Sequence, residues 1–92
     1  MNHTGGEWEL LSIDRSQALG LIVRCKFKCG AKRLIIDIDV DDREGVYEKY
    51  SAWLVGNEGA FQWIFGNSRH ADELGVPALV EKYEPIARMM LL

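Results

Sequence analysis

The middle of the chain carries two runs in which apolar and polar residues alternate, one from Leu21 to Cys29 and one from Arg33 to Asp41. Alternation with a period of two is typical of a β-strand that buries one face. Gly30 and Ala31 separate the runs, which therefore predict an antiparallel hairpin. The side chains expected to face inward are Leu21, Val23, Cys25, Phe27, Cys29, Leu34, Ile36, Ile38 and Val40.

Two registers of this hairpin keep the apolar residues on one face, because only a shift of two residues preserves the alternation. A two-residue loop at Gly30-Ala31 places Lys28 opposite Arg33, a repulsive pair. A four-residue loop instead opposes unlike charges, namely Lys26 with Asp37 and Arg24 with Asp39. Each such pair is worth ~0.2–1 kcal/mol, so we predict the longer loop. The residues left at the end of the hairpin as an unpaired basic tip would be Lys28, Lys32 and Arg33.

The segment before the hairpin, Glu7 to Asp14, has apolar residues in both phases of the alternation. Trp8 and Leu10 share one phase, whereas Leu11 and Ile13 share the other. This pattern predicts an edge strand with a β-bulge, joined to the hairpin by a turn over 14–17. Residues 1–6 are expected to be a flexible N-terminal tail of one domain that spans 1–92.

The segment after the hairpin favours a helix. Asp41 offers an N-cap with Glu44 three residues later, and apolar residues then recur at helical spacing. We predict a helix over 43–55 that packs on the inward face of the sheet. Its contact residues would be Val46, Tyr50, Trp53 and Leu54. The alternative is a fourth strand, because Tyr, Trp and Val suit sheets and Gly45 weakens a helix.

The C-terminal third predicts a short strand over 60–65, with a short helix as the alternative, and then helical structure from about Ala71. Gly75-Val76 interrupts this helix, which restarts with Pro77 at its first position. Pro85 predicts a kink or stop near Glu84. The apolar stripe would be Leu79, Tyr83, Ile86 and Met90. The fold class predicted is α+β, a small antiparallel meander of three to four strands with helices on one face.

Composition and charge narrow the class of protein. The 92 residues are 48% apolar and 27% charged, which is the composition of a globular domain. No apolar stretch approaches the ~20 residues of a membrane span, and the N-terminus lacks the basic start of a signal peptide, so we expect a cytoplasmic protein without a membrane partner. The net charge of −3 argues against a protein that coats a polyanion. Residues 24–36 nevertheless hold five bases and no acid, whereas residues 37–48 hold six acids and one base.

Two groups of residues invite a catalytic or metal-binding interpretation, and neither supports one. Cys25 and Cys29 lie four residues apart on a predicted strand, about 13 Å, which is too far for a disulfide or joint metal ligation, so both are expected to fill the core. Ser68, His70 and Asp72 are spaced two apart and are better explained by helix capping. We therefore predict no enzyme, no cofactor and no metal. A helical or looped 25–29 segment would reopen the metal interpretation.

The basic hairpin is the better candidate for a function, although charged hairpin ends commonly serve only solubility. One of Trp53 and Trp63 is expected to be exposed, and an exposed tryptophan is a usual interface anchor. The predicted partner-binding residues are Arg24, Lys26, Lys28, Lys32, Arg33 and Trp63.

These residues favour a small non-enzymatic protein-binding module. Its partner would be a protein or a ribonucleoprotein complex. Small acidic domains of this kind often act as inhibitors, immunity or antitoxin proteins, or antagonists encoded by phages or mobile elements, such as anti-CRISPR proteins. The alternatives are a nucleic-acid-binding protein that contacts phosphates through the hairpin, a cysteine-dependent metal or redox protein, and a homodimer formed through the apolar C-terminus, Met89 to Leu92.

Overall fold

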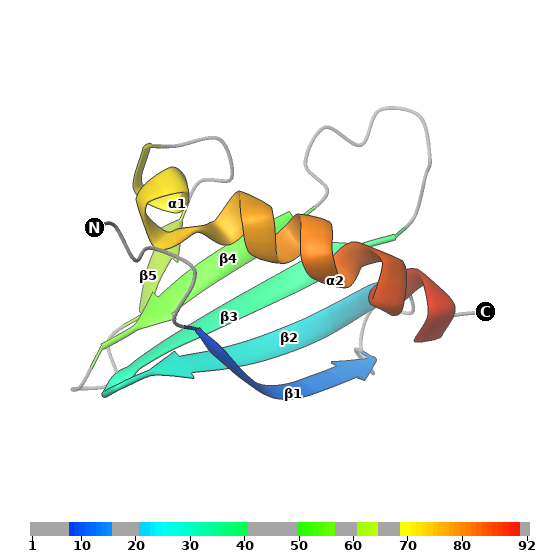
Figure 1. Ribbon diagram of the computed structural model, residues 1–92, viewed down its shortest axis with the longest axis horizontal. Helices are drawn as coiled ribbons and strands as arrows, with labels where there is room; N and C mark the ends of the chain where they lie inside the picture. The colour runs from blue at the N-terminus through cyan, green and yellow to red at the C-terminus, as the bar shows by residue number, and fades with distance from the viewer. Residues whose placement is uncertain (1–7, 16–20, 41–49, 57–60, 65–68, 91–92) are drawn as a thin grey trace.

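A five-stranded antiparallel sheet, in which the strands follow the order of the chain, carries two helices (Figure 1). The computed structural model describes residues 8–15, 21–40, 50–56, 61–64 and 69–90. The strands are β1 (Glu9–Arg15), β2 (Ile22–Cys29), β3 (Lys32–Asp39), β4 (Tyr50–Val55) and β5 (Phe61–Ile64), and the helices are α1 (Arg69–Leu74) and α2 (Val76–Met90). The predicted α+β meander is confirmed, with five strands instead of three to four.

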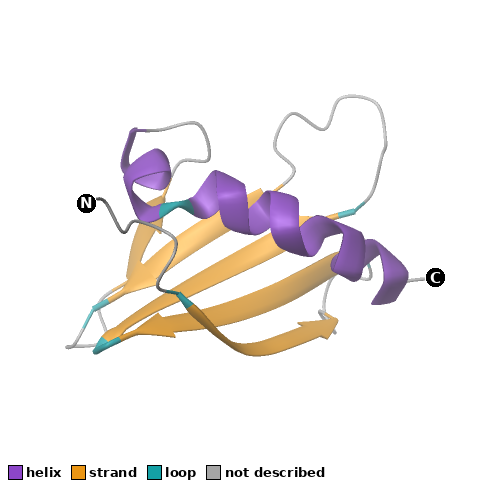
Figure 2. Ribbon diagram, viewed as in Figure 1, coloured by secondary structure: helices purple, strands orange, loops and turns teal. Residues whose placement is uncertain are grey.

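Both helices lie on one face of the sheet, so the molecule has two layers (Figure 2). The core lies between these layers and is built from alternate residues of the strands. Its buried members are Val23, Cys25, Phe27, Leu34, Ile36, Ile38, Ala52, Ile64, Ala71, Val76, Leu79, Val80 and Ala87. The inward phase predicted for the central hairpin is therefore correct from Val23 to Phe27 and from Leu34 to Ile38. Leu21, also expected inward, is 46% exposed.

The register of the β2–β3 hairpin corrects the sequence prediction. Phe27 lies opposite Leu34 and Lys28 opposite Arg33, so the loop has two residues and not four. Gly30 has a φ of 61°, a conformation that glycine adopts without strain and that suits the first position of a tight hairpin turn. Such a turn matches the twist of the strands and adds another strand pair, Cys29 with Lys32. These contributions outweigh the small charge preference on which the prediction relied.

The opposed cations of this register avoid each other by finding other partners. The Lys28 ammonium lies 3.8 Å from the Glu9 carboxylate on β1. The Arg33 guanidinium donates to the backbone carbonyls of Gly30 and Lys32, both at 3.1 Å. The repulsion that we expected to exclude this register is thereby reduced.

β1 contains the predicted bulge, between Leu10 and Ser12. Leu10 lies opposite Phe27 and Ile13 opposite Cys25, so the bulge brings both apolar residues onto the covered face although they are three apart. Leu11, the extra residue, is left 46% exposed.

The helix predicted over 43–55 is wrong for the described part of that segment, because Tyr50–Val55 is strand β4, the alternative considered for it. Residues 43–49, with Val46, lie outside the described residues, as do the predicted tail at 1–6 and the turn residues 16 and 17. The first half of the turn predicted over 14–17 is wrong, because Asp14 and Arg15 still pair with β2 as the last residues of β1. Tyr50 and Leu54 do pack against the core, but Trp53 lies on the opposite face of the sheet. Three apolar residues within about one and a half helical turns are compatible with a helix or with a strand. This segment forms a strand because it pairs with β3.

The two helices meet at Gly75, as predicted, with a φ of 76° that ends α1. α2 begins at Val76, so Pro77 occupies its second position and not the predicted first position. The Gly75 amide donates to the carbonyl of Asp72 at 3.1 Å. The indole N–H of Trp8 donates to the carbonyl of Leu74 at 2.9 Å, which satisfies one of the acceptors left free at a helix end. This bond joins the start of the described chain to the helical layer.

α2 runs through Pro85 to Met90, so the predicted stop near Glu84 does not occur. The helix packs against the sheet on both sides of the proline. Before it, the ring centroids of Tyr83 and Phe27 are 5.4 Å apart, and after it Ala87 is fully buried. This burial offsets the ~3 kcal/mol that an internal proline costs. The predicted stripe is correct at Leu79, Tyr83 and Met90, but Ile86 is 43% exposed and Ala87 takes its place.

The neighbours Ile35 and Ile36 test which face of the sheet is covered. Ile36 is 1% exposed, so Ile36→Ala should lower the free energy of unfolding by about 2–5 kcal/mol. Ile35 lies on the other face, and Ile35→Ala should cost less than about 1.5 kcal/mol. Urea denaturation of both variants measures the difference, and equal losses would contradict the two-layer arrangement.

Candidate functional site

The candidate site is the sheet face that neither described helix covers, called here the open face. Its members alternate with the core residues along the strands. They are Glu9, Leu11, Ser12, Asp14, Ile22, Arg24, Lys26, Lys28, Arg33, Ile35, Asp37, Asp39, Ser51, Trp53, Val55 and Trp63. An uncovered sheet face that carries several large apolar side chains is unusual for a surface and marks a candidate interface.

An apolar row crosses the middle of the open face. Strand pairing places Ile35 beside Trp53, and Trp53 beside Trp63. Trp63 is 49% exposed, as predicted for one of the two tryptophans, whereas Trp53 is part-buried. On the other side of Ile35, the next residue across the sheet is the cation Lys26. Neighbouring strands are ~4.8 Å apart, so Lys26 and Trp63 are about 14 Å apart along the row.

Charges on either side of this row are separated by sign along the strand direction. Toward the β2–β3 turn lies the basic end, defined by Lys26, Lys28 and Arg33, with the Glu9 carboxylate beside Lys28. Toward the other end of the strands lies the acidic end, defined by Asp14, Asp37 and Asp39. The open face is therefore polarised, which suits a partner of complementary charge.

Arg24 lies within the acidic end and is neutralised there. It lies opposite Asp37 and binds both oxygens of its carboxylate, with Nε 2.8 Å from Oδ1 and Nη2 2.9 Å from Oδ2. These hydrogen bonds raise the pKa of the guanidinium above its ordinary value. The prediction that Asp39 would neutralise Arg24 and Asp37 would neutralise Lys26 is therefore wrong.

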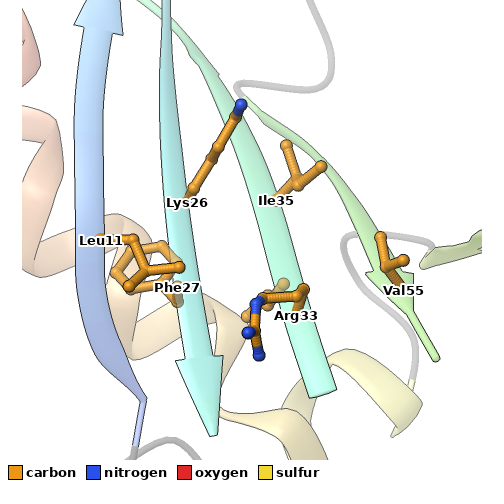
Figure 3. Close-up of a pocket in the computed structure, with 7 residues that line it drawn as sticks. Leu11, Lys26, Phe27, Arg33, Ile35 and Val55 are labelled. Atoms are coloured by element: carbon orange, nitrogen blue, oxygen red, sulfur yellow. The ribbon is translucent and has the colours of Figure 1, made fainter. Parts of the chain in front are cut away.

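The basic end borders an open groove of about 310 Å³ (Figure 3). Leu11 of β1 and Val55 of β4 lie on opposite sides of it, and the charged ends of Lys26 and Arg33 point toward its two ends. Ile35 supplies a further apolar wall. Phe27 and Leu34, whose side chains belong to the core, complete the lining.

Of the six predicted partner-binding residues, the structure places Lys26 and Arg33 at the groove. Lys28 lies on the same face but pairs with Glu9, Lys32 lies exposed beside the turn, and Trp63 lies three strands away from β2 in the row described above. Arg24 is tied to Asp37. Five of the predicted residues thus share the open face, whereas Lys32 pairs with Cys29 and so lies in the phase of the covered face, and the six do not form one cluster.

Sequence reasoning missed three lining residues, Leu11, Ile35 and Val55. Ile35 was visible as an apolar residue in the outward phase of its strand. Leu11 depends on where the bulge lies, and Val55 depends on a strand that was predicted to be a helix. Only pairing between strands brings the three together.

The two cysteines are free and differ in their surroundings. Cys25 is fully buried, and this burial raises the pKa of its thiol to about 11, with a smaller contribution from the Asp37 carboxylate. Cys29 is only part-buried beside the turn, so it does not fill the core as predicted. Both lie on β2, as the sequence predicted, and the strand keeps them four residues apart.

The described residues contain no group of three potential metal ligands among His, Cys, Asp and Glu. His70 and Asp72 both lie on α1, so Asp72 is inside the helix and does not cap it as predicted, and Ser68 lies outside the described residues. Met89, at the apolar C-terminus, is 72% exposed, and residues 91–92 are outside the description. No helix in the described ranges is long and apolar enough to span a membrane.

The hairpin register can be measured with double-mutant cycles. The cycle of Arg24→Ala with Asp37→Ala should show a coupling of about 0.5–1 kcal/mol in the free energy of unfolding, because the pair is bidentate but the Arg24 side chain is 48% exposed. The matched cycle of Lys26→Ala with Asp37→Ala should show less than about 0.3 kcal/mol. A larger coupling for the Lys26 pair would restore the four-residue loop.

Thiol alkylation should distinguish the two cysteines. The raised pKa of the Cys25 thiol, about 11, leaves only about one thiol in a thousand as thiolate at pH 8, and burial also blocks access to this thiol. Iodoacetamide at pH 8 should therefore modify Cys29 first and Cys25 only after unfolding in urea. Mass spectrometry of the Cys29→Ala variant isolates the Cys25 reaction, and rapid modification of that folded variant would contradict the buried position of Cys25.

The chain matches no protein-family model, no curated protein and no solved structure.

Proposed function

We propose that this chain is a non-enzymatic protein-binding module whose interface is the open face of the sheet. The observation that carries the proposal is the exposure of Trp63, at 49%, in an apolar row on a face that the described helices leave uncovered. Tryptophan and arginine contribute disproportionately to protein interfaces, and the face carries both beside Ile35 and Val55.

The polarised charge of the open face supports a protein partner. Opposite charges arranged at two ends select the orientation in which a partner docks and repel partners of the wrong pattern. A module of this size acts by covering part of a larger surface, and we propose that it inhibits a larger macromolecular complex. Its free thiols, Cys25 and Cys29, fit a reducing compartment, which supports a cytoplasmic location.

Binding of single-stranded nucleic acid is the second candidate. Trp63 and Trp53 offer surfaces on which bases stack, and the basic end offers phosphate contacts. The acidic end disfavours this candidate, because a strand that follows β2 and β3 from the groove meets the carboxylates of Asp14, Asp37 and Asp39, against which Arg24 is the one cation on that part of the described face. The remaining uncompensated cations are few for a protein whose net charge is −3.

Site-specific photocrosslinking tests the proposed interface. A benzophenone amino acid at position 63 lies on the open face, and one at Glu81 lies on the exposed side of α2 as the control. In cells that encode the chain, we expect a protein adduct from position 63 and not from position 81. The substitution Ile35→Asp, on the same face, should suppress that adduct at least tenfold because it places a charge in the apolar row.

Two outcomes would contradict the proposal. Equal adducts from positions 63 and 81 would show that the open face is not the interface. An adduct that nuclease removes would favour the nucleic-acid candidate. In that case the affinity of the chain for nucleic acid should also fall by about one log unit per phosphate contact for each tenfold rise in salt.

A further inference from the structure

We infer that the groove on the open face binds a segment of the partner protein in which an apolar side chain is flanked by carboxylates. This inference rests on the proposed function and names the chemistry that the interface recognises. It follows from the juxtaposition of an apolar hollow with two cations, one toward each end (Figure 3).

The hollow suits one apolar side chain. Three strands supply its walls through Leu11, Ile35 and Val55, and the lining includes Phe27 and Leu34. Its volume of about 310 Å³ lies at the lower end of the ~300–1,000 Å³ typical of ligand sites. Leu11 remains 46% exposed in the free chain, so a side chain that covers it gains from removing apolar surface from water.

Among the described residues, neither cation at the groove has a carboxylate partner. Within the part of the chain that the structure describes, no ion pair or hydrogen bond involves the Lys26 ammonium. Arg33 donates only to the neutral carbonyls of Gly30 and Lys32, so its charge is not compensated. Lys28 differs from both, because Glu9 lies 3.8 Å away. Charge complementarity therefore requires acidic groups on both sides of the apolar side chain.

The acidic end of the open face limits how much negative charge can bind. Asp37 follows Ile35 by two residues on β3 and so lies on the same face beyond the groove. Arg24 compensates this carboxylate, but Asp14 and Asp39 leave the acidic end with more acids than bases. A polyphosphate chain that continues along the strands would meet this excess of negative charge, whereas two isolated carboxylates bind at the cations and stop. This arrangement favours an acidic peptide segment over nucleic acid.

Three capped tripeptides test the inference by amide NMR titration of the full chain. The probe acetyl-Glu-Leu-Glu-amide carries both features, acetyl-Gln-Leu-Gln-amide lacks the charges, and acetyl-Glu-Ala-Glu-amide lacks the apolar side chain. We expect the first to shift the amides of Leu11, Ile35 and Val55 saturably, and each control peptide to bind about tenfold more weakly.

Matched charge variants assign the preference to the groove. The double variant Lys26→Gln with Arg33→Gln should bind the Glu and Gln forms of the leucine peptide equally. Lys82→Gln with Arg69→Gln removes the same two charge types from exposed helical positions and should keep the tenfold preference. All variants change exposed side chains, so folding is retained and is checked by the dispersion of the same spectra.

Equal affinity for the three peptides, or no saturable shift up to about 20 mM peptide, would overturn the inference. It would also be overturned if the groove amides shifted with protein concentration in the absence of peptide, which would assign the groove to a second copy of the chain. Shifts confined to the row around Trp63 would overturn the groove assignment while leaving the open face as the interface. Crosslinking from position 63 does not depend on the groove, so failure of the proposed function is recognised separately.

Discussion

The tight turn at Gly30 is the constraint on which the arrangement of the open face depends. Side chains of a strand alternate between the two faces, so a register shift of two residues keeps the same side chains on the covered face. A loop of two residues and a loop of four therefore give the same core. The loop length decides only which polar residues become neighbours. Because Gly30 accepts a positive φ, the shorter loop forms, Arg24 meets Asp37, and Lys26 is left beside Ile35 without an acidic neighbour on β3.

The two faces of the sheet are stabilised by different interactions. The covered face is held by burial, with Phe27, Ile36 and Val76 at or below 1% exposure and the Trp8 indole tying β1 to the helices. The open face contributes ion pairs that are half-exposed and worth little to stability. Residues there can change without unfolding the chain, which is the property that an interaction surface requires.

The groove forms where apolar side chains from three strands come together on the open face. The bulge in β1 turns Leu11 outward, an isoleucine occupies an outward position of β3, and β4 brings Val55 opposite Arg33. Of these side chains Leu11 is exposed and Ile35 and Val55 are part-buried, and none taken alone marks an interface. Together with the cations they form a surface that combines apolar contact with charge selection, the combination from which specific protein interfaces are built.

The sequence alone determined the strands β1, β2, β3 and β5, the break between the helices at Gly75, the bulge and the inward residues of the hairpin, because each depends on a periodicity or a backbone preference within a few residues. The tertiary structure alone decided the hairpin register, the strand at Tyr50–Val55, the continuation of α2 through Pro85 and the assembly of the groove. In those cases the local preferences differ by about 1–3 kcal/mol at most, and pairing or burial against residues distant in the chain outweighs them.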